Sequence, residues 1–89
     1  MEEYMADIII YTKNHCPYCV KAKQLLTIKK QKFTEVDIEK NPERRDEMIK
    51  HVPNARTVPQ IIINGKPIGG CDDLHALNDK GELDKLLAS

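Results

Sequence analysis

The sequence predicts an α/β fold in which a four-stranded mixed sheet is flanked by helices, in the order β-α-β-α-β-β-α. Three observations predict it. Two short apolar runs enclose a segment with helical spacing, which indicates two parallel strands and a crossover helix. An Asn-Gly pair at 64–65 separates two further apolar runs, as in a tight hairpin. Helix-start signals precede and follow that hairpin, and they add two more helices.

The first half of the chain is predicted to form a strand, a helix and a second strand. Residues 7–12 (DIIIYT) have the length and β-branched content of a buried strand. Pro17 suits the first position of a helix, and apolar residues recur at helical spacing as far as Leu26. Residues 29–32 (KKQK) place cations at the expected C-terminal end of this helix. Residues 33–38 (FTEVDI) alternate between apolar and polar, which predicts the second strand.

The second half is predicted to form a helix and then a hairpin. Asn41 is a plausible helix cap, with Pro42 at the first helical position. The hairpin turns at 64–65, and the glycine pair at 69–70 ends it.

A last helix is expected after the hairpin, with Asp72 or Asp73 as its N-cap. Gly81 should end this helix and leave residues 82–87 (ELDKLL) as a short terminal turn. A parallel half followed by an antiparallel half in this order is the thioredoxin-like architecture.

Length and composition predict one small domain spanning residues 1–89, with residues 1–6 as a flexible extension. Acidic and basic residues number 14 each, so the chain lacks the basic excess that nucleic-acid binding requires. No apolar run approaches the roughly 20 residues of a membrane span, and the first residues are acidic where a signal peptide is basic. These two features predict a cytoplasmic location, where thiols are normally kept reduced. An odd count of 3 cysteines also argues against a disulfide scaffold.

The pair Cys16 and Cys19 lies where the first strand is followed by the first helix. The first N–H groups of a helix have no internal partner and carry partial positive charge, so they stabilise a thiolate at Cys16. Lys13 and His15 could add positive charge. Cys19 comes one turn later inside the helix, where we expect it to be more buried and less acidic. The spacing therefore predicts a redox pair in which Cys16 attacks and Cys19 resolves.

Two other interpretations of the cysteines are possible from the sequence. A Cys-x-x-Cys pair is also half of a zinc site, and Cys71 with His75 could complete a structural zinc module. A structural zinc site would not explain why Pro17 stands at the helix start or why the cysteines lie between a strand and a helix. The cysteines could also simply fill core space, but the loop end of a strand is expected to be exposed.

Two further stretches carry information. In residues 57–59 (TVP), Pro59 stands at the start of a strand; if its peptide bond is cis, Val58 turns its main-chain N–H and C=O toward an extended peptide. In residues 69–73 (GGCDD), the glycines allow close approach of a ligand, and the two aspartates could bind a cationic amine. Taken alone, both stretches also fit an ordinary loop and an ordinary helix cap.

The segments YTKNHCPYC, TVPQIIING and GGCDDL together resemble a dithiol glutaredoxin of the small bacterial type, from about Asp7 to Leu87. The resemblance implies an enzyme that reduces protein disulfides and glutathione mixed disulfides, with glutathione as co-substrate and without a metal. It implies Cys16 as the nucleophile and Cys19 as the resolving cysteine. It further implies a monomer whose partners are disulfide-containing or glutathionylated proteins, such as ribonucleotide reductase.

The resemblance also implies a set of glutathione-binding residues. They are Lys13, Tyr18, Arg45, Thr57, Val58, Pro59, Gly70, Cys71, Asp72 and Asp73. Within the set, Lys13 and Arg45 match the cations near the glycine carboxylate, and Pro59 matches a cis-proline. The segment 70–73 matches the part that holds the γ-glutamyl end.

Two alternatives of function remain at this point. A glutaredoxin can hold an iron–sulfur cluster between two protomers, although Pro17 disfavours it. A thioredoxin-type reductant would work without glutathione, and turnover with glutathione and glutathione reductase separates it from the first hypothesis.

Overall fold

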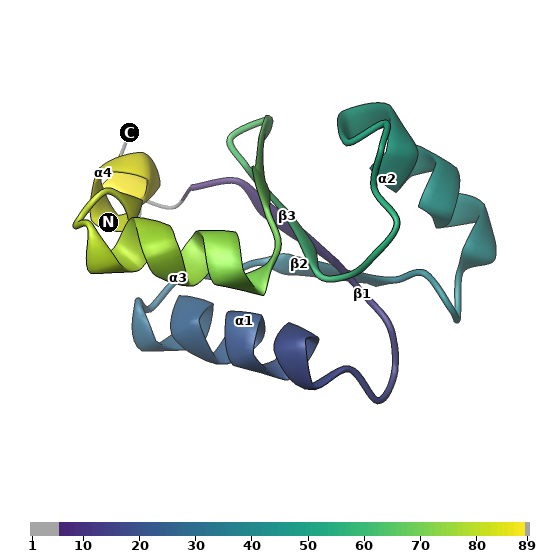
Figure 1. Cartoon of the computed structure of the whole chain (residues 1–89), viewed down its shortest axis with the longest axis horizontal. Helices are drawn as coiled ribbons and strands as arrows, with labels where there is room; N and C mark the ends of the chain where they lie inside the picture. The colour runs from purple at the N-terminus through teal and green to yellow at the C-terminus, as the bar shows by residue number, and fades with distance from the viewer. Residues whose placement is uncertain (1–5, 89) are drawn as a thin grey trace.

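The computed structural model describes residues 6–88 and contains one four-stranded mixed sheet in the order β2-β1-β3-β4 (Figure 1). The first strand, β1 (Ile8–Thr12), pairs in parallel with β2 (Thr34–Asp37). On its other side β1 pairs antiparallel with β3 (Gln60–Ile63), which pairs antiparallel with β4 (Lys66–Gly69). The predicted mixed sheet, with its parallel half and its hairpin half, is confirmed.

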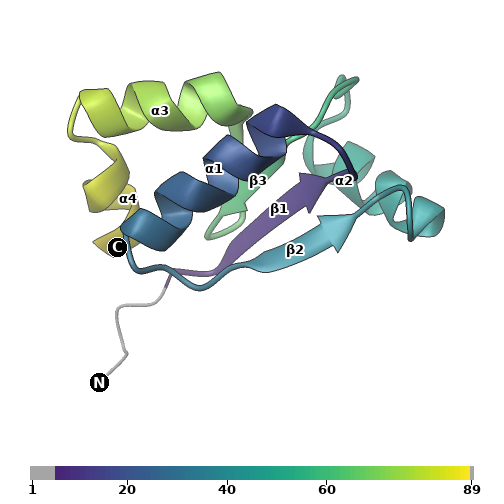
Figure 2. The same ribbon diagram turned by 90° about the horizontal axis from the view of Figure 1, so that it is seen from below.

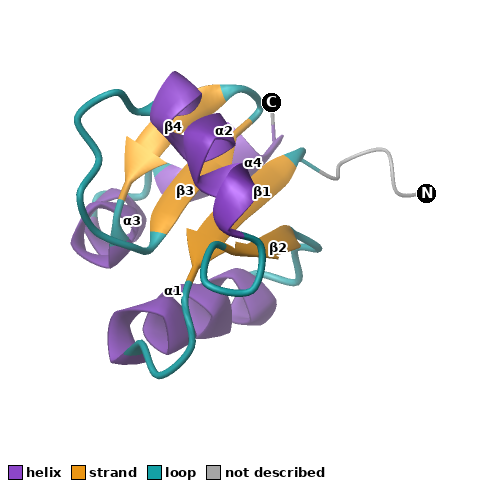
Figure 3. Cartoon of the chain, turned by 90° about the vertical axis from the view of Figure 1, so that its right-hand side faces the viewer, coloured by secondary structure: helices purple, strands orange, loops and turns teal. Residues whose placement is uncertain are grey.

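Helices cover both faces of this sheet. They are α1 (Pro17–Ile28), α2 (Arg45–His51), α3 (Cys71–Asp79) and α4 (Leu83–Ala88). Residues 82–87 were predicted to form only a terminal turn, but most of them belong to a fourth helix, α4. This helix is an addition to the predicted order of elements. Figures 1 and 3 show α2 by itself, away from α1 and α3.

The alternation of side chains along the strands produces two cores. Ile8 and Ile10 of β1 are buried together with Leu26 of α1 and Leu74 of α3. Tyr11, on the opposite face of β1, is buried in a smaller cluster that holds Met48 of α2, Val36 and Ile62. Because successive strand residues point to opposite faces, an uninterrupted apolar run such as Ile8–Ile10 requires cover on both sides. Figure 2 shows α1 and α3 on one side of β1.

Several boundaries differ from the sequence prediction. Asp7 lies before β1, where its N–H donates to Asn64 Oδ1 at 2.9 Å and so joins the strand start to the hairpin turn. The second strand is Thr34–Asp37 and is shorter than the predicted 33–38. The first helix ends at Ile28, so the lysines of residues 29–32 lie after the helix rather than in its last turn. Lys29 is its C-cap.

One of the two helix caps predicted in the second half is wrong. Asn41 is the N-cap of a short 3-10 helix that begins at Pro42, as predicted. The Asn41 side chain makes no capping hydrogen bond, and a 3-10 turn at Pro42–Arg44 precedes α2. The N-cap of α3 is Gly70 rather than an aspartate, and Asp73 instead accepts the Gly70 N–H at 3.0 Å.

Gly69 explains the register of α3. Its φ is +116°, and a Cβ there would lie 2.2 Å from the Asp73 carboxylate. Only glycine tolerates both this conformation and this contact, so the chain turns into α3 earlier than a cap at Asp72 or Asp73 would allow.

Residues 1–5 of the predicted extension lie outside the described residues, whereas Ala6 is buried in the larger core. Among residues 6–88, none of the helices combines the length and the apolar character that crossing a membrane requires.

Candidate active site

Cys16 is the N-cap of α1. Pro17 occupies the first helical position, as predicted, and the Cys16 sulfur accepts the Cys19 N–H at 3.3 Å. The Cys16 thiol in turn lies 3.8 Å from the Val58 carbonyl oxygen. The sulfur is thus directed at a main-chain amide that the helix leaves without an internal partner, and such an amide stabilises a thiolate. Cys16 is only 8% exposed, so it is less open than the sequence analysis expected.

Cys19 lies deeper than Cys16, with 2% of its surface exposed. Burial raises the pKa of the Cys19 thiol to about 12, and the hydrogen bond and charge of Cys16 contribute to the rise. The Lys13 main chain and the Lys23 ammonium act in the opposite direction. The prediction that Cys19 is the more buried member of the pair is confirmed, and the pKa of Cys19 is shifted in the predicted direction.

A cleft of about 360 Å³ opens beside Cys16. Its cations come from three segments: Lys13 before α1, Arg45 on α2, and Arg56 before β3. Ile38 and Met48 provide apolar lining. This basic cleft fits an anionic end of a ligand.

A second cleft, of about 420 Å³, shares Tyr18, Thr57 and Val58 with the first one. Its anions are Asp72 and Asp73 at the start of α3. Gly70 forms part of its wall, where a Cβ would lie 3.3 Å from the Pro59 carbonyl oxygen. The Val58–Pro59 peptide bond is cis, as the glutaredoxin resemblance implied.

All of the binding residues predicted from the sequence line these two clefts, with Cys16 in the basic one. Lys13 and Arg45 lie at the basic side, and residues 70–73 lie at the acidic side. Tyr18 is 57% exposed and lines both clefts. Segments far apart in the chain therefore converge on the N-terminal end of α1.

Sequence reasoning missed Arg56 and Gln60. Arg56 lines the basic cleft, and its signal in the sequence was a cation directly before Thr57. Gln60 lines the acidic cleft, and its amide donates to the Thr57 carbonyl at 3.0 Å. His15, which sequence analysis placed near Cys16 without a binding role, also lines the basic cleft.

Cys71 is the third thiol. It is 5% exposed, and burial is the main cause of its raised pKa. The negative charge of Asp72 raises the pKa further. Cys71 and His75 lie along a hollow between α1 and α3. Within residues 6–88, no three His, Cys, Asp or Glu side chains gather closely enough to hold a metal ion.

A thioredoxin-like sheet with a cysteine pair at the N-terminal end of its first helix defines a thiol–disulfide oxidoreductase. The glutaredoxin family profile matches residues 8–68. Glutaredoxin 3 of Escherichia coli K12 is 53% identical over 83 residues, which cover 93% of this chain and 99% of that protein. The chain belongs to the glutaredoxin family.

Solved structures agree. The solution structure of glutaredoxin from Brucella melitensis has a TM-score of 0.81 and 48% identity, with 99% of this chain and 95% of that chain covered. A crystal structure of a buckwheat glutaredoxin–glutathione complex has a TM-score of 0.82 and 25% identity, with 92% and 76% covered. The predicted family, fold and enzyme class are thereby confirmed.

Proposed function

We propose that this glutaredoxin uses glutathione to reduce glutathione mixed disulfides and protein disulfides. One observation carries the proposal: the Cys16 sulfur lies beside Val58, where a basic and an acidic cleft meet. Glutathione has a carboxylate at its glycine end and an ammonium group at its γ-glutamyl end. The tripeptide therefore matches the charge of the two clefts when its own sulfur lies at Cys16.

The two ends of glutathione bind to different segments in this proposal. Lys13, Arg45 and Arg56 attract the glycine carboxylate, and the Asp72 carboxylate attracts the γ-glutamyl ammonium. The main chain at Val58 pairs with the cysteinyl part as a short strand would. Tyr18 forms the wall that both halves share.

Reduction of a glutathione mixed disulfide requires only Cys16. Its thiolate attacks the glutathione sulfur, the protein sulfur leaves as a thiolate, and glutathione stays on Cys16. A second glutathione attacks that disulfide, forms oxidised glutathione and restores the Cys16 thiolate. The amide of Cys19 stabilises the thiolate at the start and at the end of the cycle.

Reduction of a protein disulfide also uses Cys19. Cys16 first forms a mixed disulfide with the target, and Cys19 then displaces the target and closes the Cys16–Cys19 disulfide. The 3.3 Å contact between the Cys19 amide and the Cys16 sulfur keeps the two residues close enough for this step. A reductase of this kind needs a compartment that keeps thiols reduced, and we therefore propose a cytoplasmic location.

The test is a coupled assay with glutathione, glutathione reductase and either a glutathione mixed disulfide or a protein disulfide. We expect Cys16→Ser to abolish both activities. Cys19→Ser should keep the first activity and lose the second. Loss of both activities in Cys19→Ser would show that the roles are assigned wrongly, and a wild type inactive with glutathione would reject the proposal.

Adjacent arginines provide a matched test of the basic cleft. Arg45 lines it, whereas Arg44 points to Glu47, with its Nε 3.0 Å from Glu47 Oε1. Arg45→Gln should raise the KM for the glutathione substrate about two- to fivefold, as expected for a partly exposed charge pair. Arg44→Gln should leave that KM near the wild-type value; equal effects of both changes would argue against the assigned cleft.

A further inference from the structure

Another hollow, of about 640 Å³, lies under the first turns of α1 and reaches β2. Both Cys16 and Cys19 line it. Its charged and titratable side chains come from every element around it: Lys13, His15, Lys23, Glu35, Asp37 and Lys40. The mechanism above uses neither Lys23 nor Glu35.

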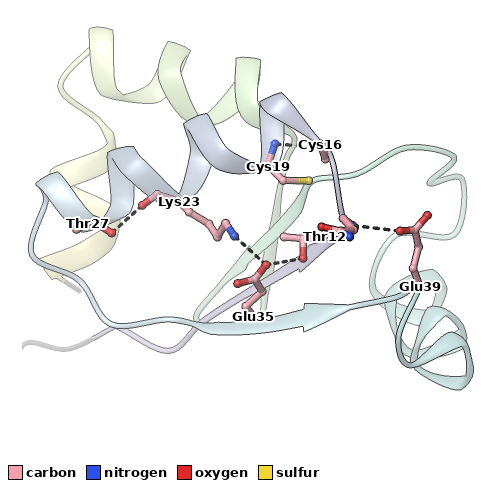
Figure 4. A network of polar contacts seen from close by, with 8 residues as sticks. Thr12, Cys16, Cys19, Lys23, Thr27, Glu35 and Glu39 are labelled. Carbon is pink, nitrogen blue, oxygen red and sulfur yellow. Dashed lines mark hydrogen bonds and ion pairs between the residues drawn. The ribbon is translucent and has the colours of Figure 1, made fainter.

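Lys23 is held in place within this hollow. It follows Cys19 by one turn of α1, and its ammonium lies 2.9 Å from Glu35 Oε2 on β2. The same carboxylate oxygen accepts the Thr12 hydroxyl at 2.7 Å, and Thr12 is only 1% exposed. Figure 4 shows the Cys19 and Lys23 side chains leaving α1 on the side that faces Thr12 and Glu35. The hydrogen bond to Glu35 thus holds the Lys23 ammonium in the hollow that Cys19 also lines.

The acidity of Cys19 changes in the course of the reaction. Burial is the main cause of its raised pKa, but the hydrogen bond and charge of Cys16 add to it. Once Cys16 is in a mixed disulfide, its sulfur carries no charge, so that contribution is lost. The lowering effects of the Lys13 main chain and the Lys23 ammonium remain. Loss of the Cys16 contribution therefore favours deprotonation of Cys19 in the mixed disulfide, although burial continues to oppose it.

We propose that Lys23 is a positioning residue for the resolving step: its ammonium, fixed by Glu35 and Thr12, stabilises the Cys19 thiolate that attacks the mixed disulfide. This inference rests on the proposed role of Cys19. The Cys19 thiol gives its proton to water in the hollow, and the thiolate attacks the Cys16 sulfur. The bond between Cys16 and the substrate sulfur breaks as the Cys16–Cys19 bond forms. The substrate sulfur leaves with the electron pair and takes up a proton.

The resolving step can be observed alone with dithiobis(nitrobenzoate) in a stopped-flow experiment, in a Cys71→Ser background. Attack of Cys16 releases the first thionitrobenzoate at a rate proportional to the reagent concentration. Displacement by Cys19 releases the second one at a rate independent of that concentration. Cys19→Ser should remove the second phase and so identify it.

We expect Lys23→Gln to slow the second phase roughly three- to tenfold at neutral pH, because an opposite charge close to a thiolate favours its formation. The pH at which this phase reaches half its maximal rate should rise, while the first phase stays near the wild-type rate. Lys23→Arg keeps the charge and should restore most of the second phase. Lys29→Gln is the matched control: Lys29 also pairs with a carboxylate, Asp84 at 3.0 Å, but at the far end of α1.

A second phase in Lys23→Gln with the wild-type rate and pH profile would overturn the inference. Equal slowing in Lys23→Arg or in Lys29→Gln would also overturn it, because the effect would then be structural rather than electrostatic. A wild type with no Cys16 phase and no turnover with glutathione would instead reject the proposed function. A normal Cys16 phase beside a second phase insensitive to Lys23 rejects only the role of Lys23.

Discussion

The two ends of α1 differ in what surrounds them. After its first turn the helix packs Ala22, Leu25 and Leu26 into the larger core. The N-terminal end carries the cysteine pair, and there Tyr18 and Val20 are 57% and 48% exposed. Packing at one end anchors the helix and leaves the main-chain amides at the other end available to a sulfur anion. In α1, the residues that stabilise the fold and the residues that react therefore occupy different parts of the helix.

The largest expected effect on stability is at the packed end. Leu26 is fully buried, so Leu26→Ala should lower the free energy of unfolding by about 2–5 kcal/mol through the lost burial and the cavity left behind. Val20→Ala at the open end should cost less than about 0.5 kcal/mol. Urea denaturation of both variants measures the difference. Similar costs would contradict the separation between the two ends.

The next prediction concerns the two thiols at the reactive end. In the reduced protein at neutral pH, iodoacetamide should modify Cys16 more than roughly tenfold faster than Cys19, because the thiolate is the reactive form. Burial raises the pKa of Cys19 to about 12, so its thiolate is scarce. Mass spectrometry of the cysteine peptides over time gives both rates. Comparable rates would mean that burial does not distinguish the thiols.

A smaller effect is expected on the face of the sheet that α2 covers. The buried Tyr11 hydroxyl donates to Glu47, and this bond is the main cause of the lowered pKa of Glu47. We expect Tyr11→Phe to lower the free energy of unfolding by about 1 kcal/mol at neutral pH, because one hydrogen bond is lost. The loss is no larger because Glu47 is partly exposed to water, which weakens the bond. Denaturation with Tyr18→Phe as the exposed control measures the change.

The pH dependence of this bond has a definite sign. Glu47 has a lower pKa in the folded protein than its ordinary value of 4.5, so its stabilising contribution is present above that value. The contribution is lost as the pH falls through the folded pKa, because Glu47 then takes up a proton. The gap between wild type and Tyr11→Phe should therefore shrink in acid, and a constant gap would exclude Glu47 as the partner that matters.

The smallest effect is expected from the ion pair at the packed end. Lys29 lies 3.0 Å from Asp84, whose side chain is 67% exposed. Lys29→Gln should change the free energy of unfolding by no more than about 0.5 kcal/mol, because water screens the pair. Thermal or urea denaturation measures it. A loss above about 1 kcal/mol would show that this pair, rather than apolar packing, fixes the end of α1.

Local signals in the sequence predicted part of the site. Pro17 fixes the first helical position, so it placed Cys16 at the helix start. The same kind of reasoning failed at α3, where an aspartate was expected as the cap. There Gly69 has a positive φ, and the N–H of the N-cap Gly70 donates to Asp73 in the first turn of α3. A local rule fails at such a position because a contact with the next turn decides the conformation.

The basic cleft shows more clearly what local sequence signals cannot predict. Lys13, Arg45 and Arg56 come from three segments, and the position of Arg56 directly before Thr57 does not by itself show which cleft its side chain lines. Its place follows from the pairing of β3 beside β1, which brings the residues before β3 close to the start of α1. Lys23 was missed for the same reason, because its partner Glu35 lies on a neighbouring strand.

The amino-acid sequence by itself determined the order of strands and helices and the position of the cysteine pair at a helix start. Side-chain periodicity, prolines and glycines act over a few residues, so they can be recognised without a structure. Only the tertiary structure decided that clefts of opposite charge meet near Cys16 and that Lys23, paired with Glu35, lines the same hollow as Cys19. Those arrangements depend on strand pairing and helix packing, which join residues far apart in the chain.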